Sequence, residues 1–229
     1  MTAYLGLNQR TAKKYHAHFL PILKIVPRKT NSHQLRRAYR YFKQSTHVIL
    51  TSPSSTSLFV SRMIKKTSKQ ALLHKHYLCV GRITAQRLRT FLPDARYSLA
   101  TIETGEGVLP LITLLPPDAR ILYPHSALSR PLIKNFLSQE NRLFFAYPHY
   151  TVEQLPLHPG IFAPYHRVIF TSPSTVRAYA SLFPTLPDKD HWCQGPITLQ
   201  EFQKNYSSSG KLIPKDFGEN ATDKKHFSM

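Results

Sequence analysis

Short apolar runs alternate along the chain with segments in which apolar residues recur at helical spacing. The apolar runs have the length of buried strands and stand at residues 4–7, 22–26, 48–50, 77–80, 97–100, 120–123, 143–150 and 168–170. The helical segments stand at residues 9–19, 35–42, 84–91, 107–115 and 129–137, and after Pro53 and Pro173. Strands that alternate with helices predict an α/β fold with parallel sheets.

One strand-to-helix stretch occurs twice. Val48–Ser55 recurs as Val168–Thr175, and each copy is an apolar run that ends in small hydroxyl residues and a proline. This pattern predicts a strand, a tight turn and a helix that carries the proline in its first turn. The free backbone N–H groups at such a helix start provide a seat for an anion.

A second stretch is duplicated in the same order. Cys79–Gln86 recurs as Cys193–Gln200, and both copies place a glycine between a strand end and a hydroxyl residue near a helix start. Two paired motifs in the same order predict two related α/β halves, each of which presents two helix N-termini.

The halves are predicted to be two doubly wound, flavodoxin-like domains with about five parallel strands each. Residues 1–28 and 150–206 form domain 1, residues 29–149 form domain 2, and residues 207–229 are a mobile C-terminal tail of low apolar content. We expect two extended crossovers to join the domains, with a cleft between them. Ligands of such sheets bind at the carboxyl ends of the strands, where both duplicated motifs lie.

The charge calls for an acidic partner. The formal net charge is +19 and the isoelectric point is about 10.1, which leaves nucleic acid, an anionic membrane and a polyanionic small molecule open. The chain lacks the pattern of a signal peptide, and it has no apolar run long enough to cross a membrane. Its two cysteines stand at equivalent places in the two halves, which favours reduced thiols in a cytosolic protein over a disulfide.

Most familiar catalytic motifs are absent. No dinucleotide, Walker A or nucleophile-elbow pattern occurs, the histidines are scattered, and the 12 carboxylates make an acid/base pair a poor prediction. The candidate groups are backbone amides and hydroxyls at the helix starts. These hydroxyls either cap their helices, at about 1 kcal/mol each, or bind an elongated anion, and the duplication favours binding. They belong to Ser52, Ser54, Thr84, Ser172, Ser174 and Thr198.

The motifs resemble those of the uroporphyrinogen-III synthase family. The resemblance rests on Leu50–Pro53 with Gly81–Ala85, and on Phe170–Pro173 with Gly195–Thr198. It extends from about residue 4 to about residue 204 and includes the proline that ends a strand at Val26-Pro27. Two departures are Asn8-Gln9-Arg10, where the family often has Thr-Arg, and Leu199, where alanine is usual.

The resemblance implies a cytoplasmic, monomeric lyase without a cofactor. It would dehydrate hydroxymethylbilane to an azafulvene and close the macrocycle through a spiro-pyrrolenine, with ring D inverted. The implied partners are this polyanionic linear tetrapyrrole and, transiently, the enzyme that supplies it, with no membrane and no specific nucleic acid. The alternative is a non-catalytic two-domain protein that binds nucleic acid or another polyanion.

The resemblance also implies roles for individual residues. The tyrosine of the return segment aligns with Tyr150, with Tyr147 as the competing alignment, and would donate a proton or hydrogen bond to the departing hydroxyl. Arg10, Arg82 and Arg130 are candidates to pair with substrate carboxylates. No metal ligand is implied. The implied substrate-binding residues are Thr51, Ser52, Ser54, Gly81, Ile83, Thr84, Arg130, Ser172, Pro173, Ser174, Gly195, Ile197 and Thr198.

Overall fold

The chain divides into two compact units. The computed structural model describes residues 1–207, 210–214 and 217. Unit 1 comprises Met1–Lys24 and Glu153–Met229, and unit 2 comprises Ile25–Val152. The chain passes between the units within two strands, β3 (Leu23–Pro27) and β8 (Leu143–Gln154). The divisions therefore fall inside these strands, a few residues from the predicted boundaries at 28/29 and 149/150.

Unit 1 is built around a parallel sheet in the order β11-β10-β9-β1-β2. Tyr4, Ala12 and Ile169 are among its buried core residues, and Phe170 packs against Tyr179 and Phe202. Its elements are β1 (Thr2–Tyr4), α1 (Gln9–Lys14), β2 (His18–Phe19), the 3-10 helix η2 (Pro159–Phe162), β9 (Arg167–Phe170), α8 (Pro173–Leu182), β10 (Asp190–Cys193), α9 (Pro196–Tyr206) and β11 (Lys211–Leu212).

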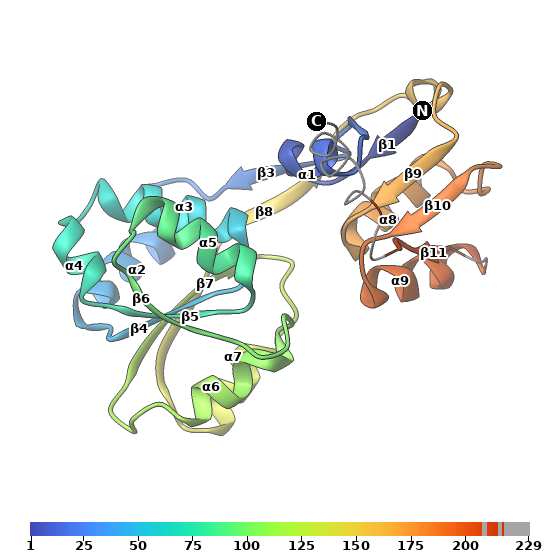
Figure 1. Ribbon diagram of the computed structural model, residues 1–229. Helices are drawn as coiled ribbons and strands as arrows, with labels where there is room; N and C mark the ends of the chain where they lie inside the picture. Colours follow the sequence, from blue (N-terminus) through green and yellow to red (C-terminus); the bar gives the residue numbers. More distant parts are fainter. Residues whose placement is uncertain (208–209, 215–216, 218–229) are drawn as a thin grey trace, which may run out of the picture. The chain divides into compact units, whose positions relative to one another are not determined.

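Unit 2 contains a sheet in the order β3-β8-β7-β4-β5-β6, whose pairs from β8 to β6 are parallel. Helices cover both faces (Figure 1): α2, α3, α4 and α5 pack over one, and α6 and α7 over the other. The remaining elements are α2 (His33–Gln44), β4 (His47–Leu50), α3 (Pro53–Ile64), α4 (Lys69–Leu73), β5 (His76–Cys79), α5 (Arg82–Phe91), β6 (Arg96–Leu99), η1 (Glu106–Val108), α6 (Leu109–Thr113), β7 (Arg120–Ser126) and α7 (Leu132–Gln139).

The duplicated motifs occupy matching places in the two sheets. The first motif follows β4 in unit 2 and β9 in unit 1, and the second follows β5 and β10. Listed from its other edge, the unit 1 sheet has the order β2-β1-β9-β10-β11. This order corresponds strand by strand to β8-β7-β4-β5-β6 of unit 2. The units thus share one spatial order, although the chain enters it at a different strand in each.

Two predictions near the start of the chain are wrong, and a third, for the C-terminal tail, falls largely outside the described residues. The helix expected over 9–19 ends at Lys14, because His16 takes a left-handed φ of 49° and the chain continues as β2. The strand expected at 22–26 as the second of domain 1 is β3, which pairs with β8 in the other sheet. Within the predicted mobile tail, Lys211 and Leu212 form β11 of the unit 1 sheet, and residues 208–209, 215–216 and 218–229 lie outside the described residues.

The two cysteines behave as predicted. Cys79 and Cys193 are free and buried at the ends of β5 and β10, and burial raises the pKa of each thiol to about 12. Within the described part of the chain, no helix has the length and apolar character needed to span a lipid bilayer.

Candidate functional site

The carboxyl edge of the unit 2 sheet carries the start of α3. Ser52 caps this helix in an extended conformation, and its Oγ accepts a hydrogen bond of 3.1 Å from the Ser55 N–H. Pro53 stands in the first turn, as predicted. Thr51 lies beside the phenol of Tyr123, a buried residue of β7 whose pKa burial raises to about 12. Hydroxyl groups from two neighbouring strands therefore meet at this edge.

The start of α5 lies at the same edge, because β4 and β5 are parallel neighbours and α3 packs against α5. Gly81 caps α5 without a side-chain hydrogen bond. A Cβ atom on Gly81 would lie 2.7 Å from Glu103 Oε2, and Glu103 Oε1 accepts a hydrogen bond of 2.8 Å from Arg82 Nε. The protein's own carboxylate thus stands beside this helix start. Thr84 is buried, whereas Ile83 is exposed.

Arg130, the other arginine predicted in unit 2, is also paired. Its Nη1 lies 2.7 Å from Glu106 Oε1. The hydrogen bond from Arg130 lowers the pKa of Glu106 to about 2. Arg82 and Arg130, the two arginines predicted to bind substrate in this unit, are therefore each paired with a glutamate of the segment that follows β6.

Tyr150 lies on β8 beside the end of β7. It is buried except for 9% of its surface, its backbone O accepts a hydrogen bond of 2.8 Å from Ala127 N, and it lies near Tyr123. Tyr147, the competing candidate, is packed into the unit 2 core, and burial raises its pKa. A phenol that core side chains enclose has no access to a substrate, so Tyr150 is the better candidate.

The first helix start of unit 1, that of α8, is capped by its own residues through more hydrogen bonds than the start of α3. Ser172 Oγ accepts from Thr175 N at 3.4 Å, and Thr175 Oγ1 accepts from Ser172 N at 3.2 Å, which completes a capping box. Thr175 Oγ1 also accepts from Thr171 N at 3.2 Å, and Ser172 Oγ lies 3.0 Å from Ser174 Oγ. Capping accounts for much of the hydroxyl pattern here.

The second helix start of unit 1, that of α9, is open. Gly195 caps it without a side-chain hydrogen bond, Pro196 follows, and no atom lies within 4 Å of the place where a Cβ on Gly195 would stand. Ile197 is exposed and Thr198 is buried. Arg10 is exposed near the start of α1, which follows β1, a strand that pairs with β9 rather than with β10.

A comparison with protein-family models shows which family the chain belongs to. The family model described as Uroporphyrinogen-III synthase HemD matches residues 8–219. The chain belongs to the uroporphyrinogen-III synthase family. Membership assigns it to tetrapyrrole biosynthesis as a lyase of that family, and the nucleic-acid- or polyanion-binding alternative is not favoured.

Solved uroporphyrinogen-III synthases share the fold. A mutant enzyme from the extremely thermophilic bacterium Thermus thermophilus matches with a TM-score of 0.63 and 13% identity, over 95% of this chain and 94% of that one. The enzyme from Helicobacter pylori 26695 matches with a TM-score of 0.66 and 14% identity, over 93% of this chain and 92% of that one. The similarity confirms a mixed α/β fold with parallel sheets. A search of curated proteins returns no match.

Within this synthase family member, the structure brings the predicted residues of each unit to one sheet edge. Thr51, Ser52, Ser54 and Gly81 lie there in unit 2, because they follow neighbouring parallel strands. The corresponding residues of unit 1 are Thr171, Ser172, Pro173, Ser174 and Gly195. Thr84 and Thr198 differ, since their burial makes them part of the packing under each helix start.

Sequence reasoning missed three residues at the unit 2 edge. Tyr123 and His149 lie inside apolar and aromatic strands, where nothing in the pattern separates them from core residues. Glu103 carried one signal, since it is one of only 12 acidic residues in a strongly basic chain. Its contact with Arg82 joins residues that are far apart in the sequence.

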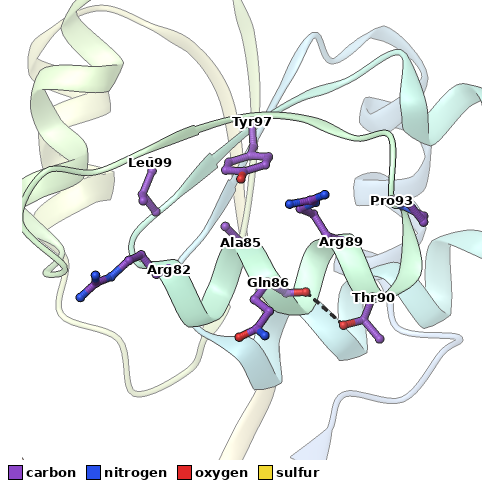
Figure 2. Close-up of a pocket in the computed structure, with 8 residues that line it drawn as sticks. All are labelled: Arg82, Ala85, Gln86, Arg89, Thr90, Pro93, Tyr97 and Leu99. Carbon is purple, nitrogen blue, oxygen red and sulfur yellow. Dashed lines mark hydrogen bonds between the residues drawn. The ribbon is translucent and has the colours of Figure 1, made fainter.

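A hollow of about 380 Å³ lies elsewhere on unit 2, between α5 and β6. Figure 2 shows the Tyr97 ring over Ala85, with Arg82 and Arg89 on either side. Among the predicted site residues only Arg82 borders this hollow. No cluster of three or more histidine, cysteine or acidic side chains suited to a metal ion occurs in the residues that the structure describes.

Proposed function

We propose that the chain converts hydroxymethylbilane to uroporphyrinogen III by positioning a flexible substrate rather than by strong acid/base chemistry. Ring A loses its hydroxyl as water to give an azafulvene, and ring D attacks through its substituted carbon. The resulting spiro-pyrrolenine fragments and recloses with ring D inverted. Holding the two ends of the substrate in one geometry supplies the rate advantage of proximity.

The carboxylates of the substrate bind, in this proposal, to the helix starts that each unit carries at its sheet edge. Backbone N–H groups at a helix N-terminus favour an anion, through hydrogen bonds and the helix dipole. The observation that carries the proposal is that both duplicated motifs end at such starts in both sheets. In unit 1 the open start of α9 at Gly195 receives a carboxylate most directly.

The hydroxyls have unequal parts in this proposal. Ser54 and Ser174 are half-buried in the first helical turns, where they can add a hydrogen bond to a bound carboxylate. Ile83 and Ile197 are exposed one position after the start of each second helix and would contact the apolar pyrrole rings. Arg10, Arg82 and Arg130 would pair with carboxylates, the latter two after exchanging their own glutamates.

Tyr150 donates a hydrogen bond or proton to the departing hydroxyl. Its place beside the end of β7, near Tyr123, supports this role. Because positioning supplies most of the rate advantage, Tyr150→Phe should lower the rate of type III formation without abolishing it.

The finer architecture and the cellular setting complete the proposal. Both units are flavodoxin-like domains, which the strand orders β2-β1-β9-β10-β11 and β8-β7-β4-β5-β6 support. The enzyme works in the cytoplasm as a monomer without a cofactor. It contacts the enzyme that supplies hydroxymethylbilane only transiently.

The test is to supply hydroxymethylbilane and identify the uroporphyrinogen isomer that forms. The proposal predicts the type III isomer, at a rate well above closure in buffer. Formation of only the type I isomer at the rate seen in buffer would show that the chain does not catalyse this reaction.

A further inference from the structure

β8 carries an extra residue where it pairs with the end of β7. Pro124 pairs with Tyr147 and His125 with Pro148, but Ser126 pairs with Tyr150, so His149 has no residue opposite it. Such a bulge redirects side chains locally. The unmatched residue directly precedes the tyrosine that we propose as the hydrogen-bond donor to the substrate.

The ring of His149 is completely buried and bonded at one nitrogen. Nε2 lies 2.8 Å from Ser55 Oγ, and the same Oγ donates to Pro124 O at 3.3 Å. Burial lowers the pKa of His149 to about 3, so the ring is neutral and carries one proton. With the proton on Nε2, His149 donates a hydrogen bond to Ser55 Oγ, which in turn donates to Pro124 O. This arrangement leaves at Nδ1 only a lone pair, which has no partner among the described residues.

The hydrogen bonds from His149 through Ser55 to Pro124 connect β8, α3 and β7. Ser55 belongs to the first turn of α3, and its N–H donates a hydrogen bond to Oγ of the capping residue Ser52. The backbone O of His149 accepts hydrogen bonds from Arg28 N at 2.9 Å and from Arg62 Nη1 at 3.1 Å. His149 is thus held through its ring and its backbone, and its ring centroid lies 5.0 Å from that of Tyr150.

The matching helix of unit 1 uses its hydroxyl differently. Thr175 occupies the place of Ser55, and its Oγ1 accepts from the N–H groups of Thr171 and Ser172. In unit 2 the Ser55 hydroxyl instead turns to β7 and β8. In unit 1 this hydroxyl caps the start of α8. In unit 2 the equivalent hydroxyl connects the start of α3 to β8, the strand that carries Tyr150.

We propose that His149 is a positioning residue: through Ser55 it fixes Tyr150 relative to the start of α3, where a substrate carboxylate binds. The inference rests on the proposed function of Tyr150 and of the α3 start. His149 does not touch the substrate and transfers no proton. Its effect is to keep the Tyr150 hydroxyl at a fixed position relative to the bound carboxylate during the reaction.

The test uses three variants with hydroxymethylbilane as substrate. His149→Phe keeps an aromatic ring and removes the bond to Ser55, and Ser55→Ala removes a single oxygen. Each should lower kcat about tenfold at nearly unchanged KM, since small misplacements carry such costs. The double variant should lose no more than either single one. His149→Gln, whose amide nitrogen reaches the place of Nε2, should recover most of the rate.

His191→Phe provides the matched control. His191 is also buried among aromatic rings, in unit 1, and its Nε2 has no partner among the described residues. This variant should change stability and leave kcat unchanged. If His149→Phe does not fold, Ser55→Ala carries the comparison. Wild-type kcat in a folded Ser55→Ala or His149→Phe variant would overturn the positioning role and leave the proposed function intact.

A second measurement does not depend on activity. The ring signals of Tyr150, assigned by NMR with labelled tyrosine and a Tyr150→Phe sample, should shift and broaden in His149→Phe and Ser55→Ala. They should remain unchanged in His191→Phe. Tyr150 signals that stay the same in the first two variants would contradict the inference, even if the chain made no type III isomer.

Discussion

Single residues decide how many backbone N–H groups at a helix start remain available to a ligand. Thr175 Oγ1 occupies the N–H groups of Thr171 and Ser172 at the start of α8. At the start of α3 the corresponding residue is Ser55, whose hydroxyl bonds His149 and Pro124 O instead. The two copies of one motif therefore differ in their hydrogen bonds through a single side chain, and more N–H groups are left available at the start of α3 than at that of α8.

Ser172→Ala tests how far capping explains the hydroxyls. Loss of a helix cap should lower the free energy of unfolding by about 1 kcal/mol, measured by urea denaturation, and should weaken turnover modestly. Ser57→Ala is the comparison, because Ser57 is a half-buried serine within α3 whose hydroxyl donates to Pro53 O and caps no helix. A stability loss in Ser172→Ala with unchanged kinetics would leave Ser172 as a cap without a role in binding.

Buried histidines predict how stability depends on pH. Burial lowers the pKa of His191 to about 4 from an ordinary value of 6.5. Between these values the unfolded chain binds the proton and the folded chain does not, so stability should fall as pH falls from 6.5 towards 4. His191→Phe should flatten this dependence in urea unfolding at about pH 7 and about pH 5, and exposed His33→Gln should not. An equal pH dependence in wild type and His191→Phe would contradict the assignment.

At the scale of elements, the two second helix starts differ in what occupies them. The start of α5 holds the carboxylate of Glu103, whereas the start of α9 is open at Gly195. A carboxylate of the protein beside a helix start competes with a carboxylate of a ligand, because both are attracted by the same N–H groups and by Arg82. On the proposed function, the substrate therefore displaces Glu103 in unit 2.

Glu103→Gln should therefore strengthen substrate binding. Without the competing charge, KM for hydroxymethylbilane should fall a few-fold while kcat changes little, in steady-state assays of isomer formation. Glu201→Gln is the control, because Glu201 on α9 pairs with Arg177 on α8, within unit 1. A KM that rises in Glu103→Gln would show that Glu103 supports the site rather than competing for it.

The elements that the sequence predicted are those with a local signal. The strands before Thr51 and Thr171 are apolar runs, and the helices after them begin with a hydroxyl residue and a proline, so their order and their place at the sheet edge followed from the pattern. The two-residue edge strands β2 and β11 have exposed side chains and so leave no such pattern. His149 and Glu103 were missed because their contacts join distant parts of the chain.

At the scale of the whole molecule, the charge is unevenly distributed along the sequence. The chain carries +19 in total, yet Asp94 is the first acidic residue. Residues before it include exposed cations on α2, such as Arg36, Arg40 and Lys43, that form no ion pair within the described residues. A field of one sign raises the encounter rate with an oppositely charged substrate.

This charge predicts a dependence on ionic strength. The value of kcat/KM for hydroxymethylbilane should fall as salt is added, because the steering field is screened, while kcat stays nearly constant. A variant with Arg36, Arg40 and Lys43 changed to Gln should show a lower kcat/KM and a weaker salt dependence. Salt that lowers kcat and leaves kcat/KM unchanged would contradict the steering role.

The central proposal is that substrate carboxylates bind at the helix starts of the two sheet edges. The most direct measurement is an NMR titration of backbone amide signals with the octacarboxylate product, uroporphyrinogen III. Carboxylate binding at these helix starts should give the largest shifts at the N–H groups of Ser54, Gly81, Ser174 and Gly195, in both units. Shifts confined to the basic helix α2, with these four amides unchanged, would contradict it.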